Sequence, residues 1–433
     1  MSRNIILITY DSLRADHCGF MGYDRDTTPA LDELAAEGTV FRNTMASGVP
    51  TIASMTSVMT GEHSLASPEI GFNTEQRNQI TSRATLAEVL SDAGYSTCGV
   101  SPNPPASSYF GFDQGFDHFE DFLHQDRGVV ERAWNRIFRR SIRGGQLTTY
   151  LRLLRNVVRR EEVLRPWEDY YDVITEWRSR VTEPYFLWVL LLEPHHPWLP
   201  PKRRQRWSTS MDKYRSFHHY WQMLNSGWEP DFTPRTRQRL IDLYDDSIRY
   251  GDMFLHRLRR DLADDDPVIV VHADHGEEFG EHGRYGHQPY LYESLVHVPL
   301  VIAGTNSRSE VTEPVGLRSL AATIAGAADV SHPFSGQNIL TDAHKRPWTT
   351  SKVFVGESRR ISIRSRRYKY LEDSHGRELY DLGKDPSEQE NLVTDRPALT
   401  ATLEDVAGAH LAEEMERRAT RAAASEVILE GQA

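Results

Sequence analysis

Short apolar runs that alternate with helical patterns constrain the fold of this chain more than any other feature. The runs are bounded by charged or turn residues, and they are Asn4–Thr9, Tyr95–Val100, Tyr185–Leu192, Val268–Val271 and Val298–Ile302. Helical patterns occur between and after them, at Thr28–Glu37, Ala53–Met59, Thr85–Ala93, Thr236–Ala263 and Leu317–Ala327. Strands that are apolar on both faces and separated by helices predict an α/β fold, with a mostly parallel sheet covered on both sides.

Composition excludes several classes of protein. The 433 residues fit one large α/β domain with a smaller one, and the net charge of −12 argues against nucleic-acid binding. No run of apolar residues is long enough to predict a transmembrane segment. Two cysteines, Cys18 and Cys98, cannot build a disulfide framework or a cysteine zinc site. The first apolar run follows at once on the N-terminus and leads into Asp11, unlike a signal peptide, so we expect a cytoplasmic enzyme.

Carboxylates and imidazoles follow three of the predicted strands. Asp11 comes after the first run, His195 after the third, and Asp274 and His275 after the fourth. A single Asp in such a place is more often a helix cap than a metal ligand. In a sheet of this kind, however, the chemistry lies just past the carboxyl ends of the strands. The three groups together therefore predict a metal site.

An arginine-rich stretch at 127–162 differs from the rest of the chain. It holds ten arginines interleaved with apolar residues, which predicts a basic amphipathic insertion around Gly144 and Gly145. One interpretation is a solvated helical hairpin whose charges pair with the acidic body of the protein. The other is a cover that contacts an anionic substrate or, peripherally, an anionic membrane surface.

Motifs spread over residues 4–395 resemble, in the same order, the sulfatase branch of the alkaline phosphatase superfamily, which includes arylsulfatases and phosphonate monoester hydrolases. Among them are Thr28-Pro29-Ala30-Leu31-Asp32, Pro194-His195-His196-Pro197, Asp274-His275-Gly276, Gly280-Glu281-His282-Gly283 and Glu378-Leu379-Tyr380-Asp381. The resemblance implies an alkaline-phosphatase-like three-layer sandwich with a mostly parallel central sheet. It also implies a catalytic domain at 1–345 and a smaller C-terminal α+β subdomain at 346–398. The region at about 120–180 falls outside the resemblance and is expected to be the arginine-rich helical insertion, and the polar tail at 399–433 is expected to be a helix with a partly disordered end.

The nucleophile window departs from the family pattern. Sulfatases carry Cys-x-Pro-x-Arg or Ser-x-Pro-x-Arg, and the first residue becomes formylglycine. Here the window reads Thr51-Ile52-Ala53-Ser54-Met55, so Thr51 takes the nucleophile position while Ala53 and Met55 replace the Pro and the Arg. The segment Ser101–Pro104 stands where the family has Gly-Lys-Trp-His. We therefore expect no formylglycine, and the paired changes indicate a redesigned site.

A threonine nucleophile implies a different reaction course from formylglycine. A formylglycine hydrate expels sulfate by collapsing to the aldehyde, whereas Thr51 would form a covalent ester that needs an activated water or another acceptor. The first hypothesis is thus a metal-dependent hydrolase of sulfate, phosphate or phosphonate esters. The alternatives are a phosphoryl-group transferase, a two-metal phosphodiesterase, and a binding protein without activity. Thr51 as a plain helix N-cap also stays open.

The resemblance assigns the metal ligands residue by residue. Asp11, Asp274 and His275 would hold one divalent ion, with Thr51 as a further ligand. Tyr10 and His275 replace an Asp and an Asn of formylglycine sulfatases. Because an imidazole suits Mn²⁺ or Zn²⁺ better than Ca²⁺, either of the first two is favoured while Ca²⁺ stays open.

The remaining site residues concern a small anionic ester as substrate. His195 aligns with the family's catalytic His, and it would protonate the leaving oxygen or hydrogen-bond the transferred group. His287 stands in place of the family's Lys; it would contact the anion or join His195 in holding a second metal. Arg14 is a candidate for the cation that Met55 no longer supplies.

Overall fold

An eight-stranded sheet forms the centre of the protein in the computed structural model, which describes residues 3–67, 74–122, 165–305, 307–343, 346–356 and 358–430. In spatial order the strands are β12 (Ser309–Val311), β2 (Thr39–Phe41), β11 (Leu300–Ala303), β7 (Val268–Ala273), β1 (Ile5–Tyr10), β6 (Tyr185–Leu191), β4 (Ser96–Val100) and β5 (His118–Glu120). All pairs from β7 to β5 are parallel, and β11 runs antiparallel to both of its neighbours. The mostly parallel sheet is confirmed.

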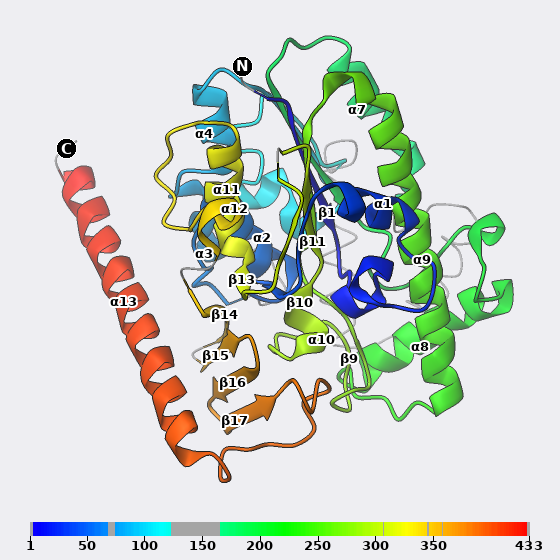
Figure 1. Cartoon of the computed structure of the whole chain (residues 1–433), viewed down its shortest axis with the longest axis vertical. Helices are drawn as coiled ribbons and strands as arrows, with labels where there is room; N and C mark the ends of the chain where they lie inside the picture. Colours follow the sequence, from blue (N-terminus) through cyan, green and yellow to red (C-terminus); the bar gives the residue numbers. More distant parts are fainter. Residues whose placement is uncertain are drawn as a thin grey trace.

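Helices cover both faces of this sheet, which gives the three layers seen in Figure 1. One layer contains α1 (Pro29–Glu37), α7 (Tyr171–Arg178), α8 (Ser210–Asn225) and α9 (Pro234–Asp261). The other contains α2 (Thr51–Thr60), α3 (Thr74–Thr81), α4 (Leu86–Asp92), α11 (Leu320–Ala327) and α12 (Ile339–Asp342). Every residue of β1, β6 and β7 is buried, because both faces of these central strands lie under helices.

The run Val298–Ile302 is two strands, so its prediction as one strand is wrong. Pro299 separates β10 (His297–Val298) from β11, since proline has no N–H to donate to a sheet. β10 joins β3 (Thr44–Met45) and β13 (Val315–Gly316) in a small second sheet, whereas β11 continues the central one. A further hairpin pairs β8 (Glu278–Phe279) with β9 (Tyr285–Gly286), and the short helix α10 (Glu293–Val296) precedes β10.

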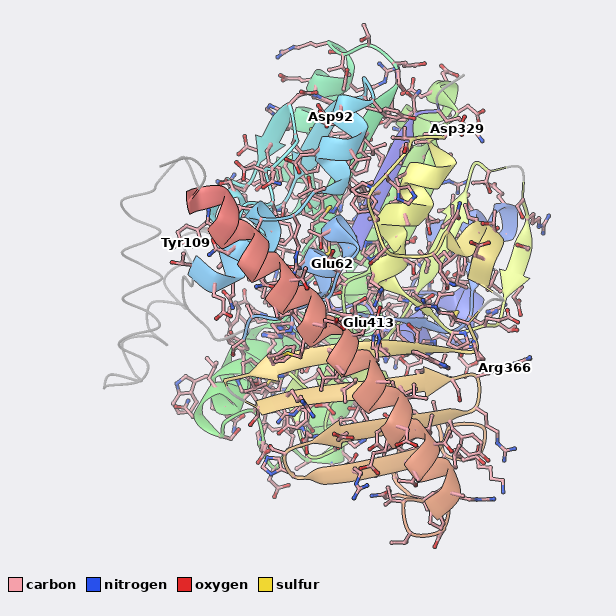
Figure 2. The ribbon with its side chains drawn as sticks, turned by 90° about the vertical axis from the view of Figure 1, so that its left-hand side faces the viewer. Glu62, Asp92, Tyr109, Asp329, Arg366 and Glu413 are labelled. Atoms are coloured by element: carbon pink, nitrogen blue, oxygen red, sulfur yellow. The ribbon has the colours of Figure 1, made fainter. Side chains whose placement is uncertain are left out.

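A separate antiparallel sheet follows near the C-terminus. Its strands are β14 (Trp348–Val355), β15 (Ser358–Ser365), β16 (Tyr368–Asp373) and β17 (Gly376–Asp381). The last helix, α13 (Pro397–Glu430), lies across this sheet (Figure 2), where Leu403 and Ala407 pack with Ile361 and Ile363. This arrangement agrees with a fold that carries a smaller α+β part after the central sheet.

Two expectations are left open by the structure. The domain boundaries at 345 and 398 stay predictions, and most of the arginine-rich insertion lies outside the described residues. Among the residues that are described, no helix has both the length and the apolar character needed to cross a bilayer.

Candidate active site

Adjacent parallel strands bring Asp11, Asp274 and His275 together. Tyr10, the last residue of β1, pairs with Ala273, the last residue of β7, so the residues that follow leave the same edge of the sheet side by side. All three side chains are fully buried, and one ligand atom from each lies within 4.8 Å of the others. The three residues thus meet at the strand ends, and their role as metal ligands stays a prediction.

Hydrogen bonds fix the two carboxylates and leave one oxygen of Asp274 without a partner. The Ser12 hydroxyl donates to Asp11 Oδ1 at 2.9 Å, and the backbone N–H groups of Ser12 and His275 donate to Asp274 Oδ1 at 3.0 and 2.8 Å. Asp274 Oδ2 is buried without a hydrogen-bond partner. Burial, and then the Asp274 carboxylate, raise the pKa of Asp11. Two buried carboxylates beside an imidazole, one with an oxygen lacking a partner, fit a divalent cation.

Thr51 faces this group from the start of α2. Its Oγ1 lies 3.2 Å from His275 Nε2, and its side chain is almost fully buried. Pro50 takes the N-cap position and no side chain caps the helix, so the interpretation of Thr51 as an N-cap is wrong. The Ser54 hydroxyl, one turn further on, donates to the Asp274 carbonyl at 2.6 Å and so holds α2 against the strand ends.

Asn103 is a site residue that the sequence analysis did not assign. It follows β4, and its Nδ2 donates to Asp11 Oδ2 at 2.5 Å and lies 3.5 Å from Thr51 Oγ1. In the sequence, the segment Ser101–Pro104 is notable only because it lacks the Lys and the His of the family pattern. The available signal was its position after a strand of the same sheet, as for Asp11.

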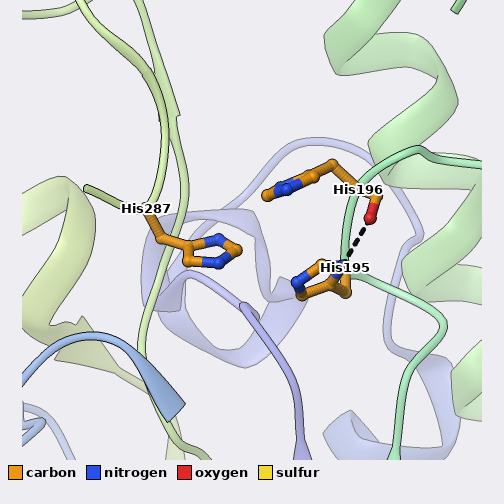
Figure 3. A group of neighbouring side chains, drawn as sticks. All are labelled: His195, His196 and His287. Carbon is orange, nitrogen blue, oxygen red and sulfur yellow. Dashed lines mark hydrogen bonds between the residues drawn. The ribbon is translucent and has the colours of Figure 1, made fainter. Parts of the chain in front are cut away.

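Three histidines form a second group beside the first. His195 and His196 follow β6, and His287 follows β9; one nitrogen from each lies within 4.8 Å of the others. Figure 3 shows the three rings converging from these two segments. The His287 ring centroid is also 4.5 Å from that of His275, so the two groups are in direct contact through these rings.

Glu277 lies beneath two of these histidines and was also missed. Its carboxylate is fully buried and accepts from His196 Nδ1 at 3.2 Å and from His287 Nδ1 at 3.3 Å. Although burial acts in the opposite direction, these two histidines hold the pKa of Glu277 below its ordinary value. The sequence signal was its place three residues after Asp274, in the same loop.

His195 is neutral near neutral pH. Burial, and then the nearby His287, lower its pKa to about 3, and its Nδ1 bonds to the His196 carbonyl (Figure 3). An imidazole in this state is a poor proton donor but a good neutral ligand or hydrogen-bond partner.

Arg14 does not offer a free cation to the site. Its guanidinium pairs with Asp16 at 2.7 Å and with Glu281 at 2.6 Å, and its side chain is only 8% exposed. Met55 is fully buried in the core, so the position of the family's Arg contributes no charge either.

Comparisons with known proteins agree with this architecture. The family model for sulfatases matches residues 3–330. An arylsulfatase of Clostridium perfringens is 26% identical to the chain, and the match covers 91% of the chain and 90% of that protein. The uncharacterised sulfatase YidJ of Escherichia coli is 22% identical, over 90% of the chain and 83% of its own length.

Solved structures share the fold at low sequence identity. A 2-O GAG sulfatase superposes with a TM-score of 0.66 at 18% identity, covering 96% of this chain and 92% of that one. The phosphonate monoester hydrolase of Agrobacterium radiobacter superposes with a TM-score of 0.65 at 17% identity, covering 97% and 96%. Together with the family match, these results show that the chain belongs to the sulfatase family of ester hydrolases.

Proposed function

We propose that this enzyme hydrolyses anionic sulfate, phosphate or phosphonate esters with the unmodified hydroxyl of Thr51 as nucleophile. The observation that carries the proposal is the position of Thr51 Oγ1, 3.2 Å from His275 Nε2 and next to two buried carboxylates. Thr51 is also the first residue of α2, where free N–H groups and the positive end of the helix dipole favour an incoming anion.

Asp11, Asp274 and His275 would hold a divalent cation, with Thr51 as a further ligand. When bound, such an ion would favour the alkoxide form of Thr51 and offset the negative charge of the ester. The mixed carboxylate and imidazole donors favour Mn²⁺ or Zn²⁺ over Ca²⁺, which prefers six or more oxygens.

The proposed reaction has two displacements at sulfur or phosphorus. In the first, Thr51 Oγ bonds to the central atom, the bond to the leaving oxygen breaks, and the proton lost by Thr51 ends on the departing alcohol. In the second, water attacks the same atom, the bond to Thr51 breaks, and the hydroxyl is restored as sulfate, phosphate or phosphonate leaves. The net change is ester plus water to alcohol plus acid, without a redox step.

The neighbours of Thr51 have positioning roles. Asn103 Nδ2 contacts both Asp11 and Thr51, so it orients the carboxylate and can donate to an oxygen that becomes negative. His195 enters as a neutral group that bonds to the ester, because its low pKa removes it from the role of acid at neutral pH.

Four substrates and one pair of variants test the proposal. Metal-loaded protein is assayed on an aryl sulfate, a phosphate monoester, a phosphate diester and a phosphonate monoester. Thr51→Val should lower turnover of the best substrate by about 10³-fold or more. Thr56→Val is the matched control, because Thr56 is a fully buried threonine of the same helix whose hydroxyl bonds to the Ile52 carbonyl.

Two results would contradict the proposal. Turnover that survives in Thr51→Val excludes this nucleophile. Transfer of the group to an added alcohol, in place of release to water, would make the enzyme a phosphoryl-group transferase on the same scaffold.

A further inference from the structure

We propose that His63 is a positioning residue for the nucleophile, because it holds the nucleophile segment (residues 47–51) that leads into α2. His63 follows the end of α2, and its ring turns back to the chain before this helix, where Nδ1 faces the Ser47 carbonyl at 3.1 Å. The C-terminal helix α13 completes the bonding of this ring. The effect on Thr51 rests on the proposed function, whereas the hold on the nucleophile segment does not.

Ser47 anchors the nucleophile segment from more than one side. Its carbonyl also accepts from the backbone N–H of Lys352 at 2.9 Å, and its hydroxyl accepts from the backbone N–H of Arg318 at 2.8 Å. Gly48 packs so closely on β14 that an added Cβ would lie 2.7 Å from the Lys352 carbonyl. A chain held this closely passes a change in the bonds of Ser47 on to Thr51 at the start of α2.

The proton on the His63 ring can be placed from its partners. Burial, and then the charges of Lys352 and Arg318, hold the pKa of His63 below its ordinary value, so the ring is neutral and carries one proton. A carbonyl can only accept, so this proton lies on Nδ1 and faces Ser47. Nε2 of the ring then accepts from the Thr350 hydroxyl at 3.2 Å.

Helix α13 supplies the next bond of the same network. Nε2 of His410 lies 3.0 Å from Thr350 Oγ1, which gives its own proton to His63, so His410 donates here. The side chains of all three residues are buried. In Figure 2, α13 extends beyond the C-terminal sheet toward Glu62, the residue before His63. The C-terminal helix therefore helps to fix the ring that holds the nucleophile segment.

The charges around this network favour hydrogen bonding over the binding of a cation. Nε2 of His63 and Nε2 of His410 each lie 3.9 Å from Glu414 Oε1, a spacing that would suit a metal ion in other surroundings. Glu414, however, pairs with the buried Lys352, and Arg318 lies 4.0 Å from the same carboxylate. Two cationic side chains beside one carboxylate repel a divalent ion. The two histidines thus act through their hydrogen bonds.

Two substitutions of His63 separate its bond to Ser47 from the filling of space. In His63→Asn the amide nitrogen takes the place of Nδ1 and can still donate to Ser47, whereas in His63→Gln it takes the place of Nε2 and cannot. On the best ester, kcat should fall by no more than about threefold in His63→Asn and by about 10-fold or more in His63→Gln. KM should stay nearly unchanged in both, because the ester still binds. Urea unfolding measures the stability that each variant loses.

Thr350 provides a second pair of variants that leaves His63 in place. Thr350→Val keeps the shape of the side chain but removes the hydroxyl between His63 and His410, so the ring is no longer held toward Ser47. We expect kcat to fall by about 3–10-fold. Thr350→Ser restores the hydroxyl and should recover most of this loss. The Thr350 pair decides the question if the His63 variants fold poorly.

Hydrogen exchange follows the nucleophile segment itself, without any substrate. In the full-length protein, the peptide that covers this segment should exchange faster in His63→Gln and Thr350→Val than in the wild type. In His63→Asn it should exchange as in the wild type. If Thr51→Val stays active, the proposed function fails, yet faster exchange confined to the variants that lose the bond still supports the hold of His63 on the segment.

The Asn and Gln variants of His63 also give the results that would overturn the inference. Equal kcat and equal exchange in the two would show that the bond to Ser47 makes no difference. A lower kcat in His63→Gln with unchanged exchange would show that His63 acts by some route other than the nucleophile segment. Faster exchange in His63→Gln with full kcat, in an enzyme that Thr51→Val inactivates, would show that the segment needs no such hold for the reaction.

Discussion

The histidines around the site share one hydrogen-bonding scheme. His275 places Nδ1 at 2.9 Å from the Gly276 carbonyl, and its Nε2 faces Thr51 Oγ1 at 3.2 Å. His195, His196 and His287 likewise direct Nδ1 to a carbonyl or to Glu277. These contacts fix the orientation of four rings around the site before any ligand arrives.

The amide of Asn103 provides a test at the scale of one residue. Asn103→Ala removes the donor to Asp11 and Thr51, so kcat should fall by about 10²-fold, as for the loss of one preorganised donor. Asn103→Asp has nearly the same shape but cannot donate, and it should lose at least as much. Steady-state kinetics on the best ester measure both variants. Full activity in Asn103→Asp would show that the residue only fills space.

The contacts and protonation states of individual side chains were the features least predictable from the sequence. The grouping of Asp11, Asp274 and His275 was predictable, because it depends only on where strands end. The partners of Arg14 were not, since its bond to Glu281 joins residues far apart in the chain. The neutral state of His195 depends on burial, which no local pattern reveals.

At the scale of elements, helices are tied to one another by buried carboxylates. The side chain of Thr28, the N-cap residue, does not cap α1. Ala30 is the second residue of this helix. Asp252, in the middle of α9, instead accepts from the backbone N–H groups of Ala30 and Leu31 at 2.8 and 3.0 Å. One carboxylate thus satisfies two free donors at a helix start and fixes α1 against α9.

Asp252 should make stability depend on pH. Burial raises its pKa from 3.8 to about 7, although the two backbone bonds act in the opposite direction. Between these values the folded state holds a proton that the unfolded state has lost, so stability from this group falls as pH rises from about 4 to about 7. Asp252→Asn lacks this contribution. Urea unfolding of both proteins should show the wild type losing stability relative to the variant over that range, and a pH-independent difference would contradict this.

Element positions were largely predictable from pattern. The runs at Asn4–Thr9 and Tyr185–Leu192 became β1 and β6 within one residue at each end, since a fully buried strand has a continuous apolar signal. Short edge strands such as β5 and β12 were missed, because three partly exposed residues carry almost no pattern. The fold of the C-terminal sheet was implied by resemblance alone.

At the scale of the whole molecule, a buried ion cluster joins the C-terminal sheet to α10. Lys369 on β16 is fully buried and lies 3.0 Å from Glu293 of α10 and 2.9 Å from Glu388. Although burial acts in the opposite direction, Lys369 and Arg364 hold the pKa of Glu293 below its ordinary value. The C-terminal sheet is therefore attached close to α10, only a few residues beyond His287.

Removing the central cation should loosen this attachment. Lys369→Ala leaves two buried carboxylates facing each other, and the free energy of unfolding should fall by about 3–5 kcal/mol. Lys384→Ala, at an exposed position, should change it by less than about 0.5 kcal/mol. Denaturant unfolding compares the two. Equal stability of both variants would show that the cluster does not hold the C-terminal sheet against α10.

The claim on which the account depends is that the hydroxyl of Thr51 attacks the ester. A slow substrate, identified from the four-ester panel, is mixed with metal-loaded protein, quenched in acid and digested for peptide mass spectrometry. The account predicts a transient sulfuryl or phosphoryl group on Thr51, absent from Thr51→Val and still formed in Thr56→Val. An active enzyme that carries the group on another residue, or that turns over with no covalent adduct under any quench, would contradict it.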